Sequence, residues 1–180
     1  MMLSNKVINE YFQTLYRGVP QEFYVLALIL LCVGAFWIFA TKRGNEGWRY
    51  ATRLLLIEYI LFIFCSTVFF RKVSKVRAFD LTPFWSYSKP ELLVENVMNV
   101  VIFVPVGLLS GIAFGGITWK MVMLIGMCLS VGIEVLQFVF KRGFMEVDDV
   151  MHNTLGCVMG YGLFCLLSRL TTKKYGYTDD

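Results

Sequence analysis

Three pairs of polar residues stand at helical spacing inside or beside long apolar runs. The pairs are Asn96 with Asn99, Glu134 with Gln137, and Asp149 with Asn153. Spacings of three or four residues place the members of each pair on one face of a helix. Polar groups inside a membrane are costly and commonly functional. The pattern therefore predicts a site that binds a polar group, exchanges a proton or holds an ion.

The composition indicates that these pairs lie in a membrane protein. Of 180 residues 57% are hydrophobic, and the mean hydropathy is +0.63, above what an ordinary soluble domain carries. The apolar residues form blocks of about 20, the length that crosses about 30 Å of hydrocarbon. We predict an all-α, multi-pass transmembrane bundle with five spans. The expected spans are residues 23–40, 51–70, 95–115, 119–140 and 150–170.

The chain divides into three parts. Residues 1–50 hold an N-terminal amphipathic helix, the first span and a basic turn; residues 51–170 form the main transmembrane domain; residues 171–180 form a polar tail. Val7, Ile8, Tyr11 and Phe12 recur at helical spacing near the N-terminus. This helix either lies on the bilayer or packs on its own domain, and the pattern favours neither.

Charge and cysteine content exclude several classes of function. The net charge of +4 is modest and its basic residues are scattered, so nucleic-acid binding is not expected. The five cysteines lie in apolar runs, none forms a CxxC pair, and the chain has one histidine. We expect no metal site and no cofactor.

The five spans also predict which loops meet. Two spans separate the long loop 71–94 from the loop 141–149, so both loops lie on the same side of the membrane. Nine lysines and arginines fall on that side and eight on the other, so the positive-inside rule alone does not decide the orientation. If the arginines that serve the polar site are left out of this count, the rule favours a cytoplasmic C-terminus.

Glu134 needs the most explanation among these residues. It lies about six residues inside its span, or roughly 9 Å deep, where an ionised carboxylate requires a cation or a water-filled cavity. We expect Arg142 as its partner, with Arg77 or Arg71 as second choices. The alternative is a polar lock between helices that includes Gln137 and Asn153.

Other residues have structural interpretations beside functional ones. Asp148 stands where a side chain caps a helix N-terminus, so the sequence leaves open whether Asp148 or Asp149 is the critical acid. Glu58 lies inside the second span, away from the other polar groups. It is a second, weaker prediction for a functional group, with Arg53 expected to compensate its charge.

Four segments, taken in order along residues 53–168, resemble the VanZ-like family. They are residues 80–84, 95–107, 130–137 and 142–150, with 153–156 close behind. The resemblance implies a bacterial cytoplasmic-membrane protein whose motif face is extracytoplasmic, and a role in teicoplanin resistance. The family's polar motif positions fall on Asp80, Asn99, Glu134, Gln137, Arg142, Asp149 and Asn153.

Our first hypothesis is a binding protein of the cell envelope. Its partner would be a membrane lipid, a lipid-linked envelope precursor or the lipid tail of a glycopeptide. Arg142 would hold an anionic headgroup, and the loop of Trp85 would flank the pocket. Four other motif residues would shape it: Asn99, Glu134, Asp149 and Asn153.

Two further hypotheses stay open at this point. An intramembrane enzyme would use Glu134 and Asp149 as an acid/base pair, or would hold a divalent cation with Asn153 and Gln137. A small lipid transporter would relay protons between Glu58 and Glu134. Such a transporter would favour a homodimer with Gly156 and Gly160 at its interface.

Overall fold

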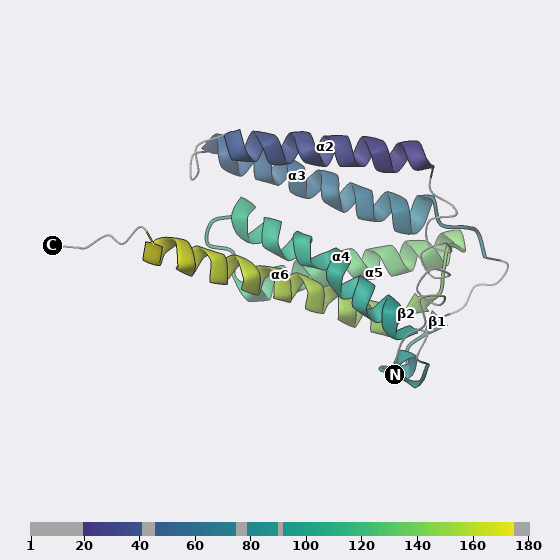
Figure 1. Ribbon diagram of the computed structural model, residues 1–180. Coiled ribbons are helices and arrows are strands. Elements are labelled where there is room, and N and C mark those ends of the chain that lie inside the picture. The colour runs from purple at the N-terminus through teal and green to yellow at the C-terminus, as the bar shows by residue number, and fades with distance from the viewer. Residues whose placement is uncertain (1–19, 41–45, 75–78, 90–91, 175–180) are drawn as a thin grey trace.

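The computed structural model describes residues 20–40, 46–74, 79–89 and 92–174 (Figure 1). Several predictions concern residues outside these ranges. They are the N-terminal amphipathic helix, Lys42 and Arg43 of the basic turn, Arg77, and the end of the polar tail.

Five helices in the described part of the chain are long and apolar enough to cross a membrane, which confirms the all-α, multi-pass fold. The helices are α2 (Gln21–Ala40), α3 (Glu46–Phe64), α4 (Leu92–Ala113), α5 (Trp119–Phe140) and α6 (Val147–Lys174). A π-helical turn, Cys65–Phe69, extends α3. Three helices begin three to five residues before the predicted spans, because hydropathy marks the hydrocarbon boundary whereas helical hydrogen bonding continues past it.

The helices form two groups that lie side by side (Figure 1). In the first, α2 runs along α3; in the second, α4, α5 and α6 pack together. Side chains of α3 to α6 build the buried apolar core, and α2 contributes none of its members. Helix α2 instead packs on α3 through side chains, such as the stacked rings of Phe23 and Phe62 at 5.7 Å.

Two glycines bring α6 against the backbone of α4. A Cβ atom at Gly156 would lie 2.2 Å from the carbonyl oxygen of Val100, and one at Gly160 would lie 1.9 Å from that of Val104. The expectation that these glycines form a homodimer interface is therefore wrong. Helix α4 of the same chain already occupies that face, since small residues let two helical backbones approach closely.

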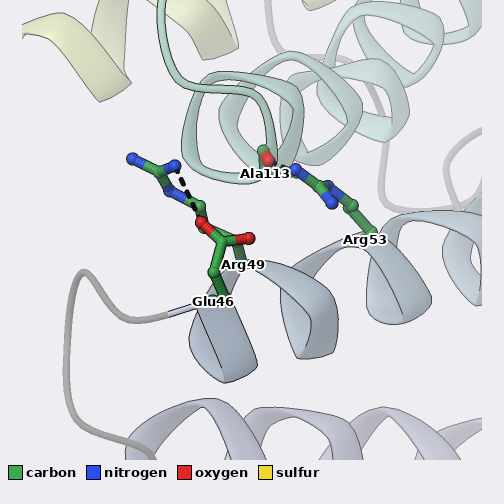
Figure 2. A network of polar contacts seen from close by, with 4 residues as sticks. All are labelled: Glu46, Arg49, Arg53 and Ala113. Carbon is green, nitrogen blue, oxygen red and sulfur yellow. Dashed lines mark hydrogen bonds and ion pairs between the residues drawn. The ribbon is translucent and has the colours of Figure 1, made fainter.

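Arginines of α3 lie at the C-terminal end of α4 (Figure 2). Arg53 donates from Nε to the carbonyl oxygen of Ala113 at 3.2 Å, and Arg49 pairs with Glu46 at 3.3 Å. The prediction that Arg53 compensates Glu58 is wrong. The last carbonyls of α4 have no partner within their helix and attract the guanidinium instead.

At the opposite end, two segments far apart in sequence meet. Strand β1 (Phe79–Asp80) pairs in parallel with β2 (Met145–Glu146), with Phe79 opposite Met145 and Asp80 opposite Glu146. The long loop and the loop after α5 thus lie on one side, as the topology predicted. A short 3-10 turn, Trp85–Ser88, follows β1 and precedes α4.

Candidate functional site

A cavity of about 310 Å³ lies where these loops meet the first turns of α4 and α6. We call it the polar pocket. Two cations, three carboxylic acids and three apolar side chains line it: Arg71, Lys89, Glu95, Glu146, Asp149, Trp85, Leu92 and Phe144. Its walls therefore offer groups of both charge signs beside aromatic surface.

Asp148 holds the turn that carries Trp85. Its carboxylate accepts hydrogen bonds from the backbone N–H of Phe84 at 2.6 Å and of Ser86 at 3.0 Å, and from the Ser86 hydroxyl at 2.5 Å. Asn96 also donates to that hydroxyl, at 3.0 Å. Asp148 therefore caps the backbone of a distant loop, which positions Trp85 and Lys89 at the pocket.

His152, one helical turn after Asp148 on α6, also contacts the segment Trp85–Ser88. One ring nitrogen, Nε2, lies 2.8 Å from the Tyr87 hydroxyl, and Nδ1 lies 2.6 Å from the carbonyl oxygen of Asp148. The ring is buried.

Asp149 faces the pocket, whereas the adjacent Asp148 does not. It accepts a hydrogen bond from the Asn99 amide at 2.7 Å. The structure thus gives the two adjacent acids different positions: Asp148 turns to the loop backbone, and Asp149 turns to the cavity. This contact also joins the polar stripes predicted on α4 and α6.

Glu134 lies behind the pocket and supports its wall. It is 1% exposed, and its Oε2 accepts a hydrogen bond from the backbone N–H of Glu146 at 3.0 Å. The prediction of an Arg142 partner is wrong, because the Arg142 guanidinium donates to the carbonyl oxygen of Arg71. Lys141 ends α5 in a left-handed conformation, φ 55°, and the chain then returns the Glu146 N–H over Glu134.

Arg71 is the cation at the centre of this region. A Cβ atom at Gly143 would lie 3.1 Å from Arg71 Nη1 and 2.9 Å from Gln137 Oε1, so a larger residue there would displace the ends of these two side chains. The charge of Arg71 acts on four carboxyl groups. These are Glu95, Glu134, Glu146 and Asp149.

The pKa of Glu146 reflects how close these acids lie to one another. Burial, together with the nearby charges of Asp149 and Glu95, raises its pKa to about 7, and the charge of Arg71 opposes this rise. A carboxyl group with this pKa exchanges its proton near neutral pH. The pocket therefore holds more acid groups than its cations balance.

The remaining predicted residues lie around the pocket rather than on its wall. Asn153 donates to the Ser130 hydroxyl at 2.7 Å, and Gln137 donates to the Thr67 carbonyl at 3.3 Å. Asp80 accepts from the N–H of Thr82 at 2.8 Å within its own turn. The first two contacts join helices, as the polar-lock interpretation proposed.

Sequence reasoning missed three charged residues of the wall, gave Arg71 only as a second choice, and expected the loop of Trp85 to flank the site. The missed residues are Lys89, Glu95 and Glu146. Spacing could have found two of them, because Glu95 precedes Asn99 by four residues and Glu146 precedes Asp149 by three. Nothing local marks Lys89, which the turn held by Asp148 brings to the site.

The profile of the VanZ/LLP1 family matches residues 23–168. This chain belongs to the VanZ/LLP1 family. Protein VanZ of Enterococcus faecium is 33% identical to it over 98 residues, which are 54% of this chain and 59% of that relative's length. No solved structure matches the chain. The VanZ/LLP1 match begins in α2, so it takes in the first span, which we had placed outside the resemblance.

Proposed function

We propose that this VanZ/LLP1 protein binds the headgroup of an amphiphilic cell-envelope component in the polar pocket. The observation that carries the proposal is a cavity with two cations and three carboxylic acids at the end of a membrane bundle. Charged groups at the end of a span lie at the depth of lipid headgroups. An amphiphile would place its headgroup here and leave its chains in the bilayer.

The wall favours a headgroup that carries both a phosphate and an amine. Arg71 and Lys89 suit the phosphate oxygens, and Glu95, Glu146 and Asp149 suit the ammonium group. A purely anionic headgroup would meet three carboxylic acids. Arg142, our first choice for an anion-binding residue, donates to a backbone carbonyl and does not line the cavity.

Trp85 supplies a further group for a ligand. Its indole Nε1 is buried and has no hydrogen-bond partner among the described residues. Lys89 lies over its ring, 4.6 Å from the centroid. A buried donor without a partner is costly, and a phosphate oxygen in the pocket would satisfy it.

The proposed consequence is a contribution to teicoplanin resistance at the outer face of the bacterial cytoplasmic membrane. By binding surface amphiphiles, the protein would alter how the membrane receives the lipid tail of a glycopeptide. The orientation that follows places the C-terminus in the cytoplasm. Arg71 and Lys89 line the pocket. Leaving them out reduces the nine basic residues on that side to seven, against eight on the other, which favours this orientation under the positive-inside rule.

A second candidate function is an intramembrane enzyme that acts on the same headgroup. It is favoured by Glu146 and Asp149 lining one cavity, with the pKa of Glu146 at about 7. Glu146 replaces Glu134 in that role, since Glu134 is buried against the backbone. We do not propose the proton relay, because no contact among the described residues joins Glu58 to Glu134 and Glu58 faces α2.

Binding is tested with the full chain in nanodiscs. We expect spin-labelled phosphatidylethanolamine to be bound in preference to phosphatidylglycerol, and Arg71→Gln and Glu146→Gln to reduce that preference about tenfold. Glu46→Gln, at the opposite end of the bundle, is the matched control. Equal binding of the two lipids, or variants that bind like wild type, would show that the pocket does not select this headgroup. Headgroup release, followed by mass spectrometry, distinguishes the enzyme.

The phenotype is tested in a teicoplanin-sensitive Gram-positive host at matched membrane levels. Wild type should raise the inhibitory concentration of teicoplanin more than that of vancomycin. Arg71→Gln and Asp149→Asn should lose that selectivity. Full protection by both variants would separate resistance from the polar pocket.

A further inference from the structure

A pair of cavities, separate from the polar pocket, lies between α2 and α3. The larger has a volume of about 390 Å³ and the smaller about 170 Å³. Aliphatic and aromatic side chains of both helices line them, and Glu58 lies in the wall of both. Leu30 is the other residue that the two cavities share.

Glu58 has no partner for one carboxyl oxygen. Its Oε1 is buried and accepts no hydrogen bond from any residue that the structure describes. Arg53, five residues earlier, is engaged with the carbonyl oxygen of Ala113. A carboxyl oxygen left unsatisfied within a membrane span is costly, so this position favours a ligand with a donor.

Gly34 keeps this space beside the carboxyl group. A Cβ atom there would lie 2.9 Å from Leu55 Cδ1 and 3.8 Å from Glu58 Oε2. The absence of a side chain at Gly34 lets the cavity reach Glu58 from α2. A ligand that enters between the two helices thus meets one carboxyl group within an apolar wall.

We propose that this cleft binds a lipophilic amine, with the ammonium group on Glu58 and the chain in the larger cavity. The charge complementarity selects an amine over an alcohol of equal length, because an ion pair gains most in a low-dielectric setting. The site does not depend on the polar pocket. Failure of phosphatidylethanolamine binding there would leave it unaffected.

The test uses photoreactive probes on the full chain in phosphatidylcholine nanodiscs. One probe is a dodecyl chain with a tail diazirine and a primary amine, and the other has the same tail and an alcohol. Adducts are mapped by mass spectrometry. We expect the amine to label Trp37 and Leu54, which line the larger cavity, about tenfold more than the alcohol.

Three variants make the test specific. Glu58→Gln should lower labelling by the amine to the level of the alcohol. Leu30→Phe, which fills the shared wall, should lower labelling by both probes, whereas Ile29→Phe, on an exposed position of the same helix, should not. Leu30→Phe retains the carboxyl group, so it tests the cleft even where Glu58→Gln disturbs folding.

Three results would overturn the proposal. Equal labelling by amine and alcohol in wild type, or unchanged amine labelling in Glu58→Gln, would mean that the cleft holds acyl chains of the bulk bilayer only. Cross-links between two copies through α2 would mean that a second chain covers the cleft.

Discussion

Two pairs of helices in this protein, α4 with α6 and α2 with α3, make contact in different ways. Helices α4 and α6 meet backbone to backbone at Gly156 and Gly160, whereas α2 and α3 meet through side chains and leave cavities. The pair that carries the polar pocket is closely packed, and the pair that faces lipid retains space around one carboxyl group.

The carboxyl groups of the two regions also differ in their hydrogen bonding. At the pocket, Asp148, Asp149 and Glu134 each accept hydrogen bonds from named donors of another segment. Between α2 and α3, Glu58 retains an oxygen without a partner in the described chain. Hydrogen-bonded carboxylates hold the loops of the first region in place, although the Trp85 indole there lacks a partner among the described residues. The unpaired Glu58 oxygen leaves the second region open to a ligand.

The largest expected effect comes from the α4–α6 contact. Gly160→Ala should lower the free energy of unfolding by about 3 kcal/mol, because its Cβ would lie 1.9 Å from the Val104 carbonyl oxygen. Gly162→Ala on the same helix meets nothing within 4 Å and should not destabilise. Thermal unfolding in detergent measures both. Equal unfolding temperatures would contradict the close contact.

The next effect concerns Asp148, whose carboxylate anchors the loop at Phe84 and Ser86. Asp148→Asn should cost about 2 kcal/mol, since it weakens three hydrogen bonds to one carboxylate. Hydrogen exchange at the amides of Phe84 and Ser86 should rise. Asp80→Asn, whose single bond is to Thr82 in its own turn, should change stability by less than about 0.5 kcal/mol. Unchanged exchange at Phe84 would refute the anchor.

A smaller effect is expected from pH. The pKa of Glu146 is about 7 in the folded protein against an ordinary 4.5. The folded state therefore holds the proton more tightly, and stability declines as pH rises from 4.5 to about 7. Glu146→Gln should flatten that decline in unfolding measured across this range. An identical pH profile would show that Glu146 is not crowded by the neighbouring acids.

The smallest effect should come from Glu58. Glu58→Gln should leave phosphatidylethanolamine binding and teicoplanin susceptibility unchanged, because Glu58 lines only the cavities between α2 and α3 among those described. The lipid-binding and susceptibility assays measure this. Loss of protection in Glu58→Gln would instead restore the transport hypothesis and join the two regions.

Much of the site's location followed from sequence, but not its wall. The stripes on three helices and the meeting of the two loops were predictable, because helical periodicity and span counting are enough for both. Lys89 was not, and Trp85 was expected only as part of a flanking loop, because both reach the pocket through the turn that Asp148 holds, 62 to 64 residues away in the chain. The role of the predicted motif residues in binding stays a prediction.

A multi-pass helical membrane protein of the VanZ/LLP1 family, with its polar residues gathered at one end, follows from the amino-acid sequence alone. These properties depend on local hydropathy and on the order of short motifs. Which donor faces each acid depends on the fold. Glu134 meets a backbone N–H and Arg142 a carbonyl because the left-handed turn at Lys141 directs the following chain. No pattern of side chains along the sequence shows that direction.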